Sequence, residues 1–414
     1  MKILFISNLY PPNAVGGYER LCHDVATGFV SRGHEVKVLT SDFGDKVAEY
    51  PGQIIHRALR LLANPGNIYA PFSATATERE ALNSANIAAL REVLERERPD
   101  VVFAWNLFFL DASFLGALSQ SGARVVFMLT DNWLAAALNG EFVGKFFAEH
   151  VFGNKPFAVK PPGWTRLLAR PPRPANSLPH GAIFGAEFMR RYYAAAGIGS
   201  ASSKVIHNGV RIDAAPDEAF VDRTRLCDPA VARLLFVGRV VELKGVHTAI
   251  DALALLGRDK KLPPLRLTIL GDAQDEAYVA RLRSAIAAAG IADRIAFAPP
   301  VKEDELFGLF QRHDIYVFPS LYEPFALTLI QALAAGIPTI ASDAGGNVEI
   351  VRHSRTGLLF RKGDPQSLAL GIKTLLGDGY LRRRLAANAR RVASEFTTER
   401  MLGEMESYLL GYKG

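Results

Sequence analysis

The sequence predicts an α/β protein with two doubly wound parallel-sheet domains. Short β-rich runs alternate with helical stretches along the 414 residues, a pattern typical of parallel sheets covered by helices. The chain exceeds what one hydrophobic core usually supports, and its two halves repeat the same plan. We therefore expect one parallel sheet in each half.

The first half contains the first set of expected elements. Its strands are short apolar runs, and its helices carry apolar residues at helical spacing. The strands are 3–7, 35–40, 101–104 and 124–129, and the helices are 19–31 and 77–97.

The second half repeats this alternation after an Asn208-Gly209 turn. The irregular, acidic stretch 213–229 follows, and we place the linker there. The expected strands are 234–237, 266–270, 294–297, 315–318 and 339–341, with helices such as 246–256 and 277–289. The expected domains are 1–205 and 206–396, followed by an amphipathic helix at 397–414 that packs back on the first domain.

Composition indicates a globular protein of a reducing compartment. Hydrophobic residues make up 49% and charged residues 22% of the chain. Cys22 and Cys227 are far apart and near no paired Cys or His, so neither a disulfide framework nor a zinc site is expected. The apolar run after Met1-Lys2 is shorter than a signal-peptide core, and no uncharged run approaches the ~18 residues of a membrane span. We expect a cytoplasmic protein.

A net charge of +6 favours an anionic partner. The region 152–186 contains no acid and many prolines, which predicts an irregular basic surface loop. Its cations near Trp164 resemble segments that settle at a lipid headgroup boundary, so a peripheral position on the inner membrane face is a second expectation. A solvated loop is the alternative. The cations of this segment are Lys155, Lys160, Arg166, Arg170 and Arg173.

One strand-loop-helix segment has the composition of a ligand site. The run 315–318 is broken by Pro319 and Ser320, and 325–335 has the Ala and Leu content of a buried helix. This arrangement holds Glu323 in the loop and Gln331 about two turns into the helix. A helix N-terminus, here Phe325, Ala326 and Leu327, offers unpaired N–H groups to an anion. An ordinary connection with an exposed Glu is the alternative.

Two further loops have features suited to binding phosphate. Gly16-Gly17 lets backbone N–H groups approach a ligand where a helix begins near Tyr18. This loop matches neither a dinucleotide fingerprint nor a Walker motif. After strand 234–237, Arg239 and Lys244 stand five residues apart and can grip a diphosphate. Because the chain has no Asp-x-Asp pair, a nucleotide diphosphate would need such protein cations. A bare glycine turn and a solvated Lys244 are the alternatives.

These features, in this order, resemble the retaining glycosyltransferases of family 4, also called glycosyl transferases group 1. The fold that the resemblance implies is GT-B, in which two Rossmann-like domains face a central cleft. The motifs are weak singly, but they span nearly the whole chain in the family's order. They are Gly16-Gly17, Gly33-His34-Glu35-Val36, Asn208-Gly209-Val210, Gly238-Arg239 with Lys244-Gly245, Glu323 with Gln331, 345–350 and 356–360.

The resemblance implies a UDP- or GDP-sugar donor in the second domain and an acceptor in the first. Arg239 and Lys244 would neutralise the departing diphosphate, and Glu323 would hydrogen-bond the transferred sugar. Family members usually retain the anomeric configuration without a metal, so we expect no metal and no cofactor. The expected acceptor is a glycan, a glycolipid or a small molecule. The remaining expected donor contacts are Gly16, Gly17, Gly238, Asp272, Val301, Phe325, Ala326, Leu327 and Gln331.

Three positions depart from the family pattern. The second Glu of its Glu-x7-Glu pair, which normally binds the ribose hydroxyls, is Gln331; an amide still accepts one hydrogen bond. Where the family often has His-Asp, this chain has Thr130-Asp131, which leaves Asp131 as the acceptor-side catalytic candidate, with a turn or N-cap role as the alternative. Asp272 stands where a second glycine is common.

The other acceptor-side candidates are Asn106, Tyr18 and Glu19. Asn106 follows the strand 101–104, and ligands bind at the carboxyl ends of strands in open α/β sheets. Two other kinds of function stay open: a catalytically silent sugar-nucleotide-binding protein, and another GT-B enzyme such as an epimerase or a phosphorylase. A nucleic-acid partner is not expected, because the basic loop contains no recognisable module.

Overall fold

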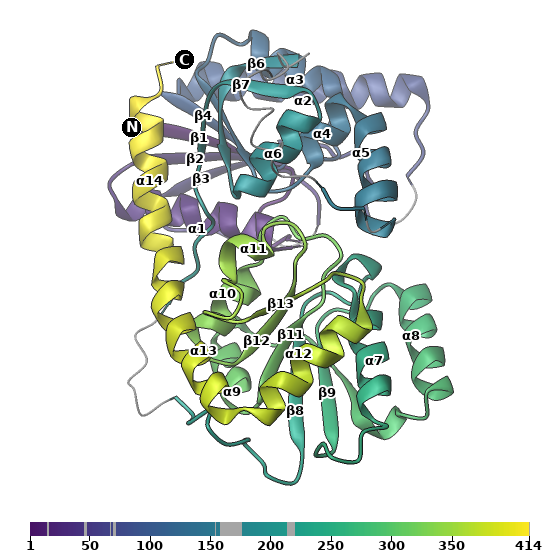
Figure 1. Ribbon diagram of the computed structural model, residues 1–414. Helices are drawn as coiled ribbons and strands as arrows, with labels where there is room; N and C mark the ends of the chain where they lie inside the picture. Colours follow the sequence, from purple (N-terminus) through teal and green to yellow (C-terminus); the bar gives the residue numbers. More distant parts are fainter. Residues whose placement is uncertain are drawn as a thin grey trace, which may run out of the picture. The chain divides into compact units, whose positions relative to one another are not determined.

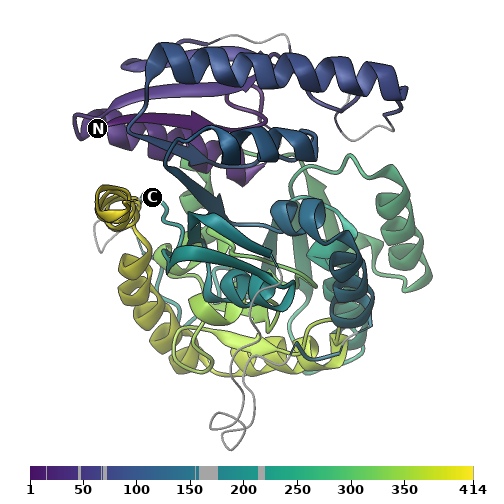
Figure 2. The ribbon, with the colours of Figure 1, turned by 90° about the horizontal axis from the view of Figure 1, so that it is seen from above.

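The computed structural model describes residues 1–14, 16–44, 48–66, 68, 72–153, 155–157, 176–212 and 220–413. These residues form two compact units (Figures 1 and 2). The first unit comprises the described parts of Met1–Phe146, Ala158–His207 and Met401–Gly414, and the second those of Phe147–Phe157 and Asn208–Arg400. Residues 147–157 thus group with the second unit, whereas the sequence placed them in the first domain.

The first unit is built on a parallel sheet with the strand order β3-β2-β1-β4-β5-β6-β7. Ile3 in β1 pairs with Val36 on one side and Val101 on the other. The central strands are buried on both faces, which explains their continuous apolar sequences. The strands are β1 (Lys2–Ile6), β2 (Glu35–Ser41), β3 (Gln53–Leu59), β4 (Val101–Ala104), β5 (Val125–Leu129), β6 (Asn176–Phe184) and β7 (Ile198–Val205).

Helices cover this sheet, and Figure 2 shows the long α2 along one side of it. Thr75 caps α2 by accepting a hydrogen bond from the Glu78 N–H, while Glu78 accepts one from the Thr75 N–H. The helices of this unit are α1 (Gly17–Ser31), α2 (Ala76–Glu97), α3 (Ala112–Gln120), α4 (Trp133–Leu138), α5 (Gly140–Phe146), α6 (Glu187–Ala195) and most of α14 (Thr398–Gly411).

The C-terminal helix α14 completes the core of the first unit. Met401, Leu402 and Met405 are buried in one cluster with residues of β1, β4 and α1. A Cβ added at Gly28 would lie 2.4 Å from the Leu402 side chain, so any larger residue there would require that side chain to move. Glu406 accepts hydrogen bonds from Arg32 and from the ring of His34. His34, part of the Gly-His-Glu-Val motif, is therefore a structural residue here.

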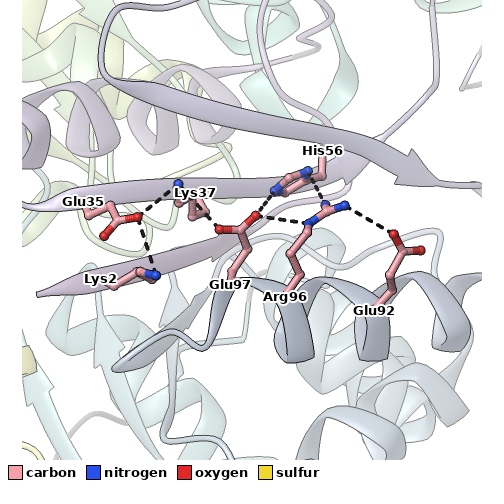
Figure 3. Close-up of polar contacts among 7 residues, drawn as sticks. All are labelled: Lys2, Glu35, Lys37, His56, Glu92, Arg96 and Glu97. Carbon is pink, nitrogen blue, oxygen red and sulfur yellow. Dashed lines mark hydrogen bonds and ion pairs between the residues drawn. The ribbon is translucent and has the colours of Figure 1, made fainter.

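A chain of charged side chains joins α2 to the strands of the first unit (Figure 3). Lys37, only 7% exposed, lies 3.5 Å from Glu97 and 3.1 Å from Glu35. The His56 ring lies between Glu97 at 3.1 Å and Arg96 at 2.9 Å. Pairing and hydrogen bonding make the burial of these groups tolerable.

The expected basic loop at 152–186 is too long, because its last part is a strand. Residues 176–184 form β6, which pairs with β5 and β7. The β6–β7 register shifts between Leu178 and Gly181, around Pro179, because proline cannot donate to a ladder. A high proline content therefore did not prevent a strand from forming at this position. Lys160, Arg166, Arg170 and Arg173 lie outside the described residues.

The second unit also contains a parallel sheet, with the order β10-β9-β8-β11-β12-β13 (Figure 1). Its core joins residues of the central strands to α7 and α12. The strands are β8 (Ala232–Val237), β9 (Leu265–Leu270), β10 (Ile295–Ala298), β11 (Ile315–Phe318), β12 (Thr339–Ser342) and β13 (Leu358–Phe360).

Aspartate caps start three helices of this unit. Asp275, Asp364 and Asp378 each accept a hydrogen bond from a backbone N–H of the first turn. The helices are α7 (Val246–Leu256), α8 (Glu276–Ala288), α9 (Glu303–Gln311), α10 (Leu327–Ala334), α11 (Asn347–Ile350), α12 (Pro365–Gly377) and α13 (Gly379–Ala393). Shorter 3-10 turns are η4 (Glu242–Lys244), η5 (Ala292–Arg294) and η6 (Ser394–Phe396), and η1 (Phe147–Phe152) is a π-helical turn.

The stretch 220–229 is not the free linker that the sequence suggested. The buried Arg223 donates hydrogen bonds to the carbonyls of Gly336, His313 and Phe310. Five guanidinium donors let one arginine tie several carbonyl groups together. This stretch therefore belongs to the second unit. In the described part of the chain, no helix is long and apolar enough to cross a membrane.

Candidate active site

The strand order of the second unit sets where its ligand edge lies. β8 and β11 are neighbours, but the chain continues from β8 to β9 on one side and from β11 to β12 on the other. The crossover helices α7 and α10 therefore lie on opposite faces, and the loops diverge at the carboxyl ends of β8 and β11. Open α/β sheets bind ligands at such a switch point.

Lys244 and Glu323 meet across this switch point. Lys244 ends η4 after β8, and Glu323 lies in the loop after β11. Nζ of Lys244 lies 2.5 Å from Oε2 of Glu323, and the two side chains are 19% and 7% exposed. The ammonium group also lies 5.8 Å from the ring centroid of Phe318. The structure thus brings together two of the catalytic residues expected from sequence.

Glycines hold the backbone close around this pair. Gly245 has φ +64°, and a Cβ there would lie 2.0 Å from the carbonyl oxygen of Pro319. A Cβ at Gly345 would lie 2.0 Å from the Glu323 carbonyl oxygen, and the Gly346 N–H donates to the same oxygen at 2.8 Å. The Gly345-Gly346 motif therefore fixes the loop that carries Glu323.

Arg239 lies in a turn after β8 that two backbone hydrogen bonds hold in place. The Gly238 N–H donates to the Leu270 carbonyl, and the Val240 N–H donates to the Asp272 carbonyl. The Arg239 side chain is exposed. Asp272 thus contributes its backbone to the turn without the second glycine that the family often has.

The helix after β11 begins later than expected. α10 starts at Leu327 rather than at residue 325, so Gln331 is one turn into the helix and not two. Phe325 and Ala326 precede the helix and are buried. The Phe325 ring packs at a tilt against the ring of Phe396, with ring centroids 5.8 Å apart.

Gln331 contacts a residue that was not among the site residues expected from sequence. Its Nε2 donates to Oε1 of Glu303, the first residue of α9, at 2.6 Å. Val301, an expected donor contact, is half-buried in the loop that leads into α9. The only signal for Glu303 in the sequence is its place two residues after Val301.

The glycine loop of the first unit is closed by Glu19. Gly16 is the N-cap of α1, and its N–H donates to the buried Glu19 carboxylate at 2.9 Å. Gly17, the first helical residue, is exposed. Tyr18 donates its hydroxyl hydrogen to the Met128 carbonyl and packs its ring on Trp105.

Asp131 and Thr130 follow β5 in the same unit. Burial raises the pKa of Asp131 to about 6, and its hydrogen bond from the Trp133 N–H at 3.0 Å opposes this only in part. Glu19 raises the pKa further through its negative charge. Thr130 is buried, and its hydroxyl oxygen has no hydrogen-bond partner among the described residues.

Asn106 lies after β4 and shapes its own loop. Its side-chain oxygen accepts a hydrogen bond from the Phe108 N–H at 2.9 Å, and its carbonyl accepts one from the Asn8 N–H at 2.6 Å. Glu19 in α1, Asp131 and Asn106 thus follow the carboxyl ends of β1, β5 and β4 in the same sheet. Among the described residues, no group of three or more His, Cys, Asp or Glu side chains is placed to hold a metal ion.

Sequence reasoning also missed how residues 147–157 support the Glu323 loop. The Phe147 ring lies 4.9 Å, centroid to centroid, from the ring of Tyr322, which precedes Glu323. Lys362 donates a hydrogen bond to the His150 carbonyl. Burial lowers the pKa of Lys362, whereas the negative charge of Asp343 raises it. No local sequence pattern signals these contacts.

Comparisons with known proteins agree with this architecture. The family model described as Glycosyltransferase Family 4 matches residues 15–214, and the one described as Glycosyl transferases group 1 matches residues 228–392. Glycogen synthase of Mycobacterium tuberculosis is 30% identical over 412 residues, which cover 96% of this chain and 91% of that enzyme. The chain belongs to the group 1 glycosyltransferases.

Other relatives of this glycosyltransferase match over shorter stretches or in fold. D-inositol 3-phosphate glycosyltransferase of Jonesia denitrificans is 37% identical over 175 residues, which are 42% of this chain and 41% of that enzyme. Sucrose-phosphate synthase from Thermosynechococcus elongatus has a TM-score of 0.72 at 21% identity, covering 98% and 97% of the two chains. Anabaena Alr3699/HepE, solved with UDP-glucose, has a TM-score of 0.68 at 22% identity and covers both chains fully. The GT-B fold expected from sequence is thus confirmed.

Proposed function

We propose that this glycosyltransferase transfers a hexose from a UDP- or GDP-sugar to a hydroxyl of a glycan, a glycolipid or a small molecule, with retention and without a metal. The observation that carries the proposal is the Lys244–Glu323 pair at the switch point of the second unit. One member is a cation suited to a diphosphate, and the other is a hydrogen-bond acceptor suited to sugar hydroxyls. Except for Gly16 and Gly17, which lie in the first unit, the expected donor contacts belong to the same unit.

In this proposal Lys244 and Arg239 neutralise the charge that develops on the diphosphate as its bond to the anomeric carbon breaks. Preorganised cations in a partly buried site stabilise such charge strongly. Glu323 accepts hydrogen bonds from the sugar, and the new bond forms between the acceptor oxygen and the anomeric carbon on the face that the diphosphate leaves. The acceptor proton departs with the diphosphate, so the atoms balance without a separate base.

The acceptor side of the proposal rests on Asp131, Asn106, Tyr18 and Glu19 in the first unit. An ionised carboxylate accepts hydrogen bonds and cannot donate them, and the raised pKa of about 6 leaves Asp131 ionised at neutral pH. It can therefore orient an acceptor hydroxyl. The buried Thr130 hydroxyl beside it is a second polar group at this position.

A donor screen tests the function directly. Saturation-transfer NMR against UDP- and GDP-sugars, with UDP-glucose first, should give one binding donor, and mass spectrometry should then show a glycosylated product. The anomeric coupling constant of that product reports retention or inversion. Donor binding without turnover would indicate a silent binding protein. An epimerised donor, or phosphate-dependent release of sugar phosphate, would replace simple transfer by another GT-B reaction.

Metal independence has its own test. Activity in excess chelator should equal activity in added Mg²⁺ or Mn²⁺, because Lys244 and Arg239 supply the positive charge that a metal would otherwise provide. Loss of activity in chelator, restored by one of these ions, would contradict this part of the proposal.

We also propose a cytoplasmic protein that binds the inner membrane face through its basic segment. Within this segment, Lys155 lies 3.2 Å from Glu149, which precedes the segment, so part of the charge of Lys155 is compensated. Substituting Lys155, Lys160, Arg166, Arg170 and Arg173 by Gln should weaken binding to vesicles containing anionic lipid, because each nearby cation adds attraction to such a surface. Equal binding of the wild type to anionic and neutral vesicles would contradict the membrane proposal.

A further inference from the structure

The contact between Gln331 and Glu303 joins two helix starts at the ligand edge of the second unit. α9 follows β10 and α10 follows β11, so the first turns of both helices lie at the carboxyl end of the parallel sheet. Gln331 Nε2 donates to Glu303 Oε1 at 2.6 Å. The contact therefore places a carboxylate beside position 331, one turn into the helix that follows the Glu323 loop.

We propose that Glu303 supplies the carboxylate that binds the ribose hydroxyls of the donor nucleotide, and that Gln331 positions it. This inference rests on the proposed function, because it requires a nucleotide donor in the second unit. Position 331 carries an amide where the family has an acid. A carboxylate offers lone pairs on both oxygens, so Glu303 can accept from Gln331 and from a hydroxyl at once.

The three acids that open α9 have separable roles. Glu305 accepts a hydrogen bond from the Lys302 N–H at 2.9 Å and thereby closes the first turn of the helix. Glu303 contacts Gln331. Asp304 lies between them and is exposed. All three carboxylates interact favourably with the positive end of the helix dipole, so the dipole alone does not distinguish Glu303 from Asp304.

Asp304 is therefore the matched control for Glu303. Glu303→Gln and Asp304→Asn each remove one charge from the same helical turn. The two substitutions change nucleotide affinity equally if only helix stability or general charge matters. They change it to different extents if Glu303 contacts the ribose.

Exchanging the acid and the amide between positions 303 and 331 gives a second test. Gln331→Glu alone sets two carboxylates against each other, and like charges at this distance repel. The reciprocal variant Glu303→Gln with Gln331→Glu restores one acid and one amide in reversed order. If the pair acts as a unit, the reciprocal variant binds more tightly than either single variant.

The experiment is isothermal titration calorimetry of the full chain with UDP, GDP and their 2′-deoxy forms at one salt concentration. For the ribonucleotide that binds, Glu303→Gln should raise Kd about tenfold, the lower range for a hydrogen bond to a charged group. Its effect on the 2′-deoxy form should be smaller. Asp304→Asn should leave both Kd values within about twofold, within the small effect expected of a surface change.

The possible results separate the inference from the function on which it rests. A wild type that binds one ribonucleotide, with Glu303→Gln indistinguishable from Asp304→Asn, overturns the role of Glu303 alone. A reciprocal variant as weak as the two single variants combined overturns the pairing. A wild type that binds neither UDP nor GDP overturns the donor assignment, and the role of Glu303 falls with it. Circular dichroism of each variant checks that loss of binding is not loss of fold.

Discussion

Lys244 and Glu323 form an ion pair of 2.5 Å between loops that follow two neighbouring strands, β8 and β11. The pair fixes both side chains before any donor arrives. Each charge compensates the other in a place where little water reaches either, which limits the cost of burying them. Breaking the pair would therefore leave one buried charge without compensation.

Removing one partner of this pair should destabilise the second unit. Lys244→Ala leaves the Glu323 carboxylate buried without its cation, and we expect a loss of about 3 kcal/mol in the free energy of unfolding. The double variant with Glu323→Ala should lose less than the two single variants combined. Urea unfolding followed by circular dichroism measures the three changes.

The exposed pair between Lys373 and Asp259 in the same unit is the control, with 2.7 Å between Nζ and Oδ2. Lys373→Ala should change stability by under about 1 kcal/mol. Strictly additive effects of Lys244→Ala and Glu323→Ala would show that the two side chains are not coupled.

Arg239 should matter for rate and not for stability. Because its side chain is exposed, Arg239→Ala should leave the unfolding curve almost unchanged, while kcat falls by about 10²–10³, the usual loss for one preorganised group that stabilises developing charge. Arg239→Lys keeps the charge but not the fork of donors, and should lie between the wild type and the alanine variant.

The exposed Arg258 serves as the comparison for this series. Arg258→Ala removes the same charge from the same unit, so a similar loss of rate in both variants would assign the effect to net charge. Unchanged kcat in Arg239→Ala would remove Arg239 from the diphosphate site.

Local patterns in the sequence were sufficient for the sheet framework. Apart from the C-terminal helix, which ends at Gly411 and not at residue 414, the strand and helix ranges expected from periodicity lie within two residues of their observed ends, because apolar runs and their breakers are local signals. Val101–Ala104 and Val246–Leu256 match at both ends. Four strands were missed: β3, whose burial is mixed, β6, which prolines precede and interrupt, and the strands β7 and β13.

The side-chain contacts of the site could not be predicted in the same way. Lys244 and Glu323 are separated by 79 positions in the chain, and Gln331 and Glu303 by 28. Motif order indicated the first pair through the family resemblance. The second pair depends on how α9 and α10 pack, and no periodicity reports that packing. Phe147 joins the second unit through its contact with Tyr322, which is likewise a tertiary effect.

Asp131 should make the protein less stable as the pH rises. Burial raises its pKa from 3.8 to about 6 in the folded state, so the folded state binds more protons than the unfolded state between these values. The cost of ionising it is absent below about pH 4 and complete above about pH 6. Asp131→Asn keeps an oxygen that can accept from the Trp133 N–H, and should be more stable than the wild type at pH 7 by about 3 kcal/mol.

Asp364 serves as the control, because its pKa is lowered and its effect on stability therefore changes with pH in the opposite direction. The hydrogen bond from the Ser367 N–H lowers the pKa of this capping carboxylate most, and Arg361 lowers it further. Partial burial opposes both effects. Asp364→Asn should therefore lose stability relative to the wild type at neutral pH, and the difference should shrink in acid. Urea unfolding at a series of pH values measures both variants. A difference for Asp131→Asn that does not change between pH 4 and pH 7 would contradict the raised pKa.

The network in Figure 3 should make the first unit less stable in mild acid. Arginine only donates and carboxylate only accepts, so His56 must accept from Arg96 at Nδ1 and donate to Glu97 at Nε2, which is the neutral ring. Burial and the charge of Arg96 lower the pKa of His56, while Glu97 opposes them. As the pH falls below the ordinary value of 6.5, the unfolded chain takes up the proton first and stability falls until the folded ring also titrates.

His56→Gln keeps one donor and one acceptor but does not titrate, so its stability relative to the wild type should rise as the pH falls from 7 to 5. Urea unfolding followed by tryptophan fluorescence measures this difference, because Trp105 and Trp133 lie in the first unit. His353→Gln, at an exposed position of the second unit, is the matched control. If the His56→Gln difference stayed constant across this range, His56 would not be held neutral by Arg96, and the network would stabilise α2 without responding to pH.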